Sequence, residues 1–315
     1  MAEEVAEIAP AAGPPDPAVH EFGEAMTVVE PEVPAPPPPP QVAALTPGPD
    51  LAPARPEPRV GDGPTSTWRL NAVPFQDARG LKLVAIIIDD AGLDRALTAR
   101  ALRLAGPLTI SFLPYAPDIQ RQAEEARRRG HELMVHLPME PMSVSENPGP
   151  DALTTRLPRD ELMRRLALHL GRFNGYVGAN NHMGSRMTAD ANALLPVLEE
   201  LRDRGLLFVD SRTSRETVAA AIAGHLGMAG TARDVFIDHE ESRESVRARL
   251  DDIERIAKRV GLEVAIGHPH DRTVEALERW LPTLAERGLT LAPISALVMR
   301  RHLAAPLVSQ GAAKP

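Results

Sequence analysis

From about residue 80 onward, short apolar runs alternate with longer amphipathic stretches, and this alternation limits the possible folds more than any other feature of the chain. The apolar runs predict strands over residues 82–88, 108–113, 131–136, 175–179, 206–210, 234–238, 262–267 and 289–293. The amphipathic stretches predict helices over residues 94–105, 118–129, 159–173, 189–204, 214–226, 242–260 and 272–287. Strand and helix in repeated alternation indicate an α/β protein with a parallel sheet. Seven or eight such units favour a closed or nearly closed barrel over an open doubly wound sheet.

The first 64 residues differ in composition from the rest of the chain. They hold 17 of the 32 prolines and carry 11 Asp or Glu against 2 Arg, so their net charge is −9, whereas the remainder is close to neutral. Large apolar residues are too few there to form a core, which predicts a disordered, acidic, Pro-rich linker over residues 1–78. We expect the folded domain over residues 79–300 and a flexible tail over residues 301–315.

Charge and composition also bear on partners and location. The near-neutral folded part offers no basic surface for nucleic acid. The sequence shows no signal peptide and no run of 18 apolar residues, so a cytoplasmic location stays open. Pro-rich spacers often separate a membrane anchor from a working domain, and we therefore expect membrane tethering through an N-terminal anchor missing from this sequence. The absence of cysteine excludes disulfides, Cys-ligated zinc and a Cys nucleophile.

The pair Asp89-Asp90 stands at the end of the first predicted strand, after the apolar run 83–88. Two adjacent carboxylates beside a buried strand are unfavourable, because like charges repel and a low-dielectric core penalises ionisation. Parallel α/β folds place their active sites at the carboxyl ends of strands. The pair therefore indicates a metal ligand next to a general base. Alternatively, one carboxylate caps the next helix and the other faces water.

Three of the ten histidines, His136, His182 and His268, also lie where predicted strands end. One such histidine is more often a hydrogen-bonded structural residue than a functional one. Three at one rim, beside the paired carboxylates, are harder to explain in that way. One Asp and two His around a cation, with a position left open for water, are typical of a catalytic zinc site.

These segments together resemble the divergent polysaccharide deacetylases, a branch of the NodB-homology carbohydrate esterases. The matching segments, in chain order over roughly residues 80–297, are Ile88-Asp89-Asp90, Gly130-His131-Glu132, His136-Leu137-Pro138-Met139-Glu140-Pro141, Asn180-Asn181-His182-Met183-Gly184-Ser185, Phe208-Val209-Asp210-Ser211-Arg212-Thr213, Asp234-Val235-Phe236-Ile237-Asp238 and Ile266-Gly267-His268-Pro269. The resemblance implies a distorted (β/α) barrel with seven or eight strands, which agrees with the strand count above.

The resemblance also implies roles for single residues. In that family the first Asp of the pair is the general base and the second binds the metal, which points to Asp89 and Asp90. The strand-end general acid corresponds to His268. The family's His-x-x-x-His metal motif is His136-x-x-x-Glu140 here, so one imidazole is missing. We expect His182 to supply it from a neighbouring strand end, while a hard cation could instead take Glu140.

The implied cofactor is a divalent metal ion, and zinc is the expected one, held by Asp90, His136 and His182. Further residues are expected to hydrogen-bond these ligands or to contact substrate: Glu140, Asn181, Asp210, Ser211 and Asp238. Asp210 or Asp238 would orient His268. Four of them have a structural alternative: Glu140 in a salt bridge, Asn181 in a turn, and Asp210-Ser211 as a helix cap.

The favoured function is metal-dependent removal of acyl groups, acetyl above all, from a carbohydrate or a cell-envelope glycan in the periplasm or envelope. One alternative is a degenerate, metal-containing protein that binds a glycan or a partner without turnover. Another is a metal-dependent hydrolase of peptides or phosphoesters. Only ten Phe, Trp and Tyr are present to stack on sugar rings, so the substrate is expected to be short or not a polysaccharide. The sequence leaves the oligomeric state open.

Overall fold

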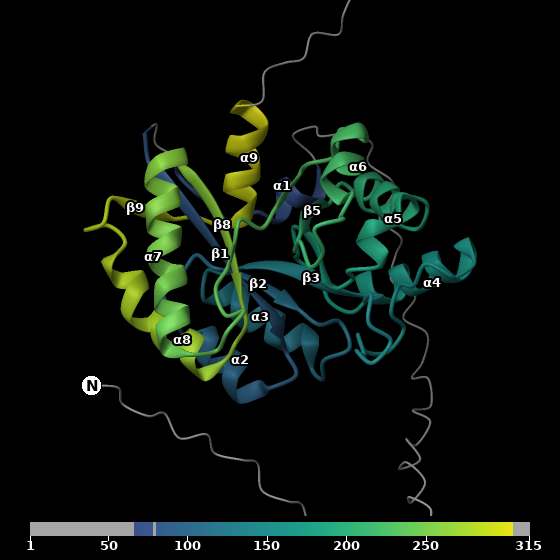
Figure 1. The fold of residues 1–315 in the computed structure, drawn as a ribbon, viewed down its shortest axis with the longest axis horizontal. Helices are drawn as coiled ribbons and strands as arrows, with labels where there is room; N and C mark the ends of the chain where they lie inside the picture. Colours follow the sequence, from purple (N-terminus) through teal and green to yellow (C-terminus); the bar gives the residue numbers. More distant parts are fainter. Residues whose placement is uncertain (1–65, 78–79, 305–315) are drawn as a thin grey trace, which may run out of the picture. The chain divides into compact units, whose positions relative to one another are not determined.

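A computed structural model describes residues 66–77 and 80–304. Its core is a nine-stranded sheet that curls on itself, and most of its helices lie outside the sheet (Figure 1). The strands are β1 (Lys82–Ala91), β2 (Thr109–Phe112), β3 (Glu132–Met139), β4 (Gly178–Met183), β5 (Leu207–Asp210), β6 (Gly230–Ala232), β7 (Val235–Phe236), β8 (Leu262–Gly267) and β9 (Leu289–Leu291). The predicted α/β class and (β/α) barrel are confirmed.

The sheet is parallel, and its strand order is β6-β5-β4-β3-β2-β1-β8-β7, with β9 paired to the beginning of β1. Because the strands are parallel, their carboxyl ends meet at one rim. The helices are α1 (Thr67–Asn71), α2 (Arg95–Ala101), α3 (Ile119–Arg128), α4 (Arg159–Leu170), α5 (Ala191–Asp203), α6 (Ala219–His225), α7 (Arg243–Val260), α8 (Asp271–Trp280) and α9 (Ile294–Ala304), with 3-10 turns η1 (Met187–Ala189) and η2 (Leu281–Thr283).

Alternate residues of β1 belong to two different apolar clusters. Val84, Ile86 and Ile88 pack into the layer between sheet and helices. Leu83, Ala85 and Ile87 pack into the interior of the barrel. Because side chains alternate along a strand, the next residue of the inner row is Asp89. By the same alternation, His136 follows inward-facing Met134 on β3, and His268 follows Val264 and Ile266 of β8.

The barrel interior is filled from the end opposite this rim by α1 and α9. Trp68 of α1 is only 2% exposed, and it shares the inner cluster with Leu297 and Val298 of α9. The backbone N–H of Trp68 donates to the carbonyl of Gly205. Residues 66–77, which fall within the predicted linker, thus pack on the domain, and α9 extends past residue 300. Of the linker predicted over 1–78 and the tail predicted over 301–315, residues 1–65, 78–79 and 305–315 lie outside the described residues.

Several predicted element ends differ from the structure. β3 and β4 extend three and four residues beyond their predicted ends, and β6 was not predicted. The predicted helix over 214–226 begins only at Ala219. β4 was placed too early because its last residues are polar, yet Asn180, Asn181 and His182 pair with β3 in regular register. Polar residues that face a site interrupt the apolar pattern without ending the strand.

No helix in the described part of the chain is long and apolar enough to cross a membrane.

Candidate functional site

A bulge at the end of β1 brings both adjacent carboxylates to the same site. The pairing of β1 with β2 shifts register between Ile88 and Ala91, and Asp90 has a left-handed φ of 54°. On a regular strand, adjacent side chains would point to opposite faces. The strand predicted over residues 82–88 would have ended before both carboxylates. Instead it continues to Ala91, and the irregular backbone at Asp90 turns the second carboxylate toward the rim.

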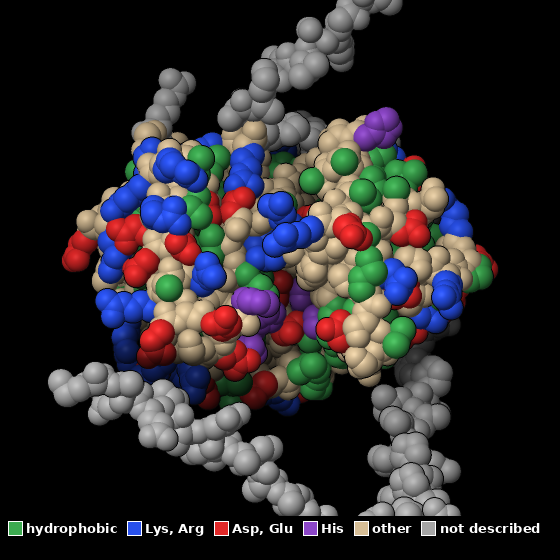
Figure 2. Space-filling model, in the orientation of Figure 1, with side chains coloured by type: hydrophobic (Ala, Val, Ile, Leu, Met, Phe, Trp, Pro, Cys, Tyr) green, Lys and Arg blue, Asp and Glu red, His purple; other side chains and the backbone are tan. Residues whose placement is uncertain are grey.

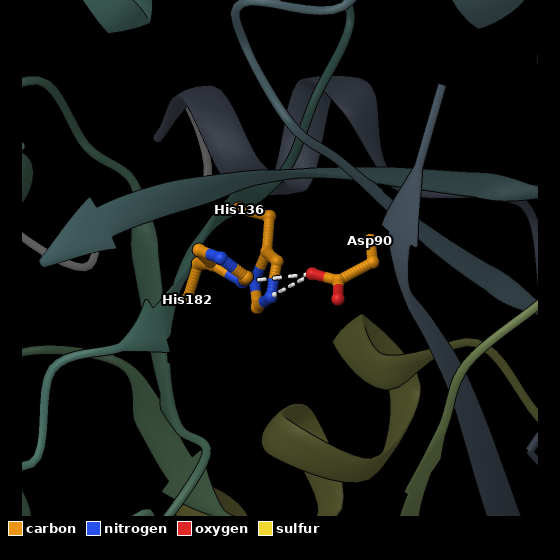
Figure 3. A group of neighbouring side chains, drawn as sticks. All are labelled: Asp90, His136 and His182. Carbon is orange, nitrogen blue, oxygen red and sulfur yellow. Dashed lines mark ion pairs between the residues drawn. The ribbon is translucent and has the colours of Figure 1, made fainter. Parts of the chain in front are cut away.

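Asp90, His136 and His182 form one compact group (Figure 3). The ligand atoms they offer lie within 4.8 Å of one another. Oδ1 of Asp90 is 2.8 Å from Nδ1 of His182 and 3.2 Å from Nε2 of His136. Zinc–ligand bonds of about 2.0–2.2 Å in a tetrahedral arrangement separate ligand atoms by roughly 3.4 Å, so these spacings suit a cation at their centre.

Asn180 determines which nitrogen of His136 faces this group. The amide nitrogen of Asn180 donates to both carboxylate oxygens of Asp89, at 2.8 and 2.9 Å. Its amide oxygen is therefore left to accept from Ser111 Oγ at 2.5 Å and from Nδ1 of His136 at 2.9 Å. Since Nδ1 carries the proton of a neutral imidazole, Nε2 presents a lone pair toward Asp90.

A lone pair on Nε2 and a carboxylate oxygen 3.2 Å away repel each other unless a proton or a cation lies between them. Neither imidazole contact of Asp90 Oδ1 has hydrogen-bond geometry, and this buried oxygen has no hydrogen-bond partner among the described residues. The ligand atoms of the three residues nevertheless lie within 4.8 Å of one another. One carboxylate and two imidazoles are also ligands that zinc prefers, so the residues fit a divalent cation.

The charges of the group are strongly coupled. Burial acts to raise the pKa of Asp90, but the two imidazoles outweigh it and hold that pKa far below its ordinary value. Burial acts to lower the pKa of His136, but the Asp89 and Asp90 carboxylates outweigh it and raise the pKa. Asp89 is 2% exposed, and desolvation raises its pKa against the opposing effects of His136, His268 and Asn180.

His268 is oriented by Asp238 on the opposite side of the rim. Oδ1 of Asp238 lies 3.0 Å from Nδ1 of His268, and Oδ2 accepts from the His268 backbone N–H and from Thr273 Oγ1. Burial acts to lower the pKa of His268, but Asp238, Asp90 and Asp89 raise it to about 9. The free Nε2 is 3.9 Å from Oδ2 of Asp90, so a protonated imidazole faces the carboxylate pair.

Two other predicted residues, Glu140 and Asp210, form hydrogen bonds away from the Asp90 group. Oε2 of Glu140 accepts from the backbone and hydroxyl of Thr155, and Oε1 lies 3.5 Å from Nε of Arg186. It thus holds a loop and is not among the residues grouped with Asp90. Asp210 accepts from the Arg212 N–H and from Thr217, so of the two carboxylates considered for His268, only Asp238 reaches it.

Asn181 and Ser211 do lie at the site, where both line its cavity. Oδ1 of Asn181 accepts from the backbone N–H of Ser211 at 2.9 Å, which ties the ends of β4 and β5 together. Ser211 Oγ accepts from Asn180 at 3.1 Å. Asn180 is thus the hub of this hydrogen-bond network. The sequence analysis did not assign it as a partner of the ligands, although the Asn-Asn-His run places it close to His182.

The site opens into a cavity of about 530 Å³ at the carboxyl rim. Figure 2 shows histidines and carboxylates in a hollow at the centre of this face, with Lys and Arg side chains along one edge. Arg212, Arg233, Phe236 and His239 line it besides the predicted residues. No sequence signal marked Arg233, because it comes from the short link between β6 and β7. His270 stacks beside His268, with ring centroids 5.4 Å apart, and Asp238, His268 and His270 form a second acid–imidazole group.

A curled parallel barrel with a carboxylate–imidazole group at its carboxyl rim defines a (β/α)-barrel protein with a candidate cation site. The chain belongs to the divergent polysaccharide deacetylase family, whose profile matches residues 86–298. The resemblance to the divergent polysaccharide deacetylases, predicted from sequence, is therefore confirmed.

Two relatives and one solved structure illustrate this similarity. Uncharacterized protein YibQ of Escherichia coli K12 is 32% identical over 215 residues, 68% of this chain and 67% of YibQ. An uncharacterized protein of Haemophilus influenzae is 29% identical over 205 residues, 64% of this chain and 72% of that protein. The crystal structure of an uncharacterized protein from Agrobacterium tumefaciens C58 has 33% identity and a TM-score of 0.73, covering 76% of this chain and 98% of that one.

Proposed function

We propose that this protein is a metal-dependent hydrolase that removes acyl groups, acetyl above all, from a carbohydrate. The observation that carries the proposal is the convergence of Asp90, His136 and His182 on one centre, with Asp89 and His268 at the same cavity. Membership of the divergent polysaccharide deacetylase family supports a carbohydrate substrate.

The metal would be held by Oδ1 of Asp90, Nε2 of His136 and Nδ1 of His182, and zinc is the ion we propose. When bound, it supplies a polarised acyl oxygen and a water of lowered pKa. The hydrogen bond from Nδ1 of His136 to Asn180 fixes the imidazole with Nε2 toward the group.

Asp89 is the proposed general base. Burial raises the pKa of its carboxyl group, while two bonds from Asn180 hold both oxygens in place, so the group is fixed and ready to accept a proton. It takes that proton from the water that attacks the acyl carbon.

His268 is the proposed general acid. Asp238 binds its Nδ1 and leaves Nε2 facing the cavity, and a pKa of about 9 keeps the ring protonated near neutral pH. Nε2 donates its proton to the leaving amine or alcohol as the C–N or C–O bond breaks. His268 thus carries the proton that it donates before the reaction begins.

Metal analysis and acetate release from N-acetylated sugars test the proposal on the full chain. Asp89→Asn should retain the metal and lose about 10²–10⁴-fold in turnover, because it removes the base and spares the ligands. His136→Ala should lose both metal and turnover. His225→Ala, an exposed residue of α6, is the matched control and should behave as wild type.

Two outcomes would contradict the proposal. Full turnover in Asp89→Asn would remove Asp89 as the base. Tightly bound metal without acyl release from any sugar would favour the degenerate, glycan-binding alternative. Placement in the periplasm or envelope and tethering through an N-terminal anchor stay predictions, which fractionation of cells that express the natural gene would test.

A further inference from the structure

Two arginines on the cavity wall have no acidic partner. Arg212, just after β5, and Arg233, between β6 and β7, both line the cavity that contains Asp89 and Asp90. Among residues 66–77 and 80–304, neither guanidinium has a carboxylate oxygen within 4.0 Å. By contrast, Arg186, which follows β4, is paired with Glu140. Two unpaired cations at one cavity need an explanation.

Arg233 is rigidly positioned. Its Nε donates to the carbonyl of Ser211 at 2.7 Å, and its Nη2 donates to the carbonyl of Arg212 at 2.9 Å. Its guanidinium also lies 4.7 Å from the centre of the Phe236 ring. A guanidinium has five N–H donors, and these contacts occupy only two of them. The group is therefore fixed in place while part of its donor capacity remains for a ligand.

Arg212 lies against Arg233 and is exposed. Its Nη1 is 3.5 Å from the carbonyl of Arg233, and its backbone has a left-handed φ of 50°, which is unusual for a residue other than glycine. Asp210 holds this conformation by accepting from the Arg212 N–H at 2.8 Å. Strained backbone of this kind often occurs where a side chain must be aimed at a ligand.

The like charges of the two arginines depress the pKa of Arg233, after burial, which is the larger cause. The carboxylates whose charges act on Arg233 are those of Asp89, Asp210 and Asp234. Each has another partner: Asn180 donates to Asp89, the Arg212 N–H and Thr217 donate to Asp210, and Arg301 pairs with Asp234. A purely structural role, in which Arg233 joins two loops, accounts for its two carbonyl contacts. It does not account for Arg212, whose side chain has, among the residues that the structure describes, only the single long contact to Arg233.

We propose that the acylated sugar recognised here carries an anionic group, a carboxylate or a phosphate, which Arg233 and Arg212 bind on the cavity wall. The inference rests on the proposed function and names its substrate class. Guanidinium groups bind both anions through paired N–H donors. The arginine side of the cavity would thereby orient the sugar with its acyl group toward Asp89 and His268. Figure 2 shows basic side chains along one edge of the hollow that holds the histidines.

Binding of three sugars by calorimetry tests this proposal. The probes are N-acetylglucosamine, N-acetylmuramic acid, which adds a carboxylate, and N-acetylglucosamine 6-phosphate. The full chain with Asp89→Asn is used, so that affinity is measured without turnover. We expect the better anionic probe to bind about tenfold to hundredfold more tightly than the neutral sugar. Whichever anion is preferred identifies the source of the charge.

Binding of the same probes to arginine variants is the second part of the test. Arg233→Gln should remove about tenfold or more of the preference for the anionic probe. Arg212→Gln should reduce the preference for the anionic probe only roughly twofold to fivefold, because this side chain is exposed and its charge is screened by solvent. Arg215→Gln is the matched control: it removes one exposed charge from the same loop but does not line the cavity, and it should change nothing. The affinity for N-acetylglucosamine should stay the same throughout.

Equal affinity for neutral and anionic probes would overturn the proposal. So would an equal loss for all three probes in Arg233→Gln, which would mean that Arg233 only supports the loops. Neither result depends on catalysis. Failure of the anion proposal is thus distinguishable from failure of the hydrolase proposal, which acetate release by the protein without the Asp89 change decides.

Discussion

Replacing Asp238 with Asn should abolish the high pKa of His268 in the metal-free protein. The carboxylate accepts from His268 Nδ1 at 3.0 Å and from its backbone N–H at 2.6 Å, and it is almost completely buried. An amide of the same shape retains part of the hydrogen bonding but not the negative charge. Burial lowers the pKa of His268, and only the weaker raising effects of Asp90 and Asp89 would then oppose it.

The magnitude follows from the pKa itself. A rise from the ordinary 6.5 to about 9 corresponds to about 3 kcal/mol at about 1.4 kcal/mol per pKa unit. Because the folded-state pKa lies above the unfolded one, this stabilisation is fully present below pH 6.5. It is lost as the pH rises through about 9. Asp238→Asn should therefore lower the free energy of unfolding most at acidic to neutral pH, by up to about 3 kcal/mol, and much less above pH 9.

NMR titration of the His268 ring and urea unfolding at several pH values, both in the presence of a chelator, measure these effects. Thr273→Val is the control, because it removes one hydrogen bond to Asp238 and keeps the carboxylate, so the His268 pKa should stay high. An ordinary His268 pKa in the wild type would refute the reasoning, as would a raised pKa that survives in Asp238→Asn.

Three further predictions concern the site and the domain boundary. Asn180→Leu leaves Asp89, His136 and Ser111 without their hydrogen-bond partner, so urea unfolding should show a free energy of unfolding lower by about 3 kcal/mol or more. Zinc titration should show a roughly 10–100-fold weaker affinity. An unchanged affinity would show that Asn180 does not orient the His136 ligand. Zinc at about 100 times its dissociation constant should stabilise the protein by about 2.7 kcal/mol in thermal unfolding, and His182→Ala should abolish this, whereas stabilisation that persists would exclude His182 as a ligand. Trp68→Ala should destabilise the domain by about 3–5 kcal/mol in thermal unfolding, because this side chain fills the barrel interior; a neutral effect would mean that α1 is dispensable.

The metal-type residues could be predicted from sequence because each stands at a strand end. In a parallel barrel all carboxyl ends share one rim, so Asp90, His136 and His182 had to lie near one another once the strands were identified. The structure brings their ligand atoms within 4.8 Å. Their roles stay predictions until metal and turnover are measured.

Other features depend on contacts between segments far apart in the chain. Whether Asp210 or Asp238 reaches His268 is decided by the pairing of β7 with β8, which places Asp238 and leaves Asp210 in its own loop. The local sequence around the two aspartates gives no means of choosing. Arg233 reaches the cavity for a similar reason, through a link between two short strands that the apolar pattern marked poorly.

By itself, then, the sequence determined the α/β barrel and the residues at its rim, because apolar periodicity and chain order are local properties. Only the tertiary structure decided the bulge that turns Asp90 beside Asp89, the Asn180 hub that fixes the His136 ring, and the filling of the barrel by Trp68 and α9. Each of these is a contact across strands or between the chain's distant ends. Such contacts follow from three-dimensional register and packing, which no local pattern of residues specifies.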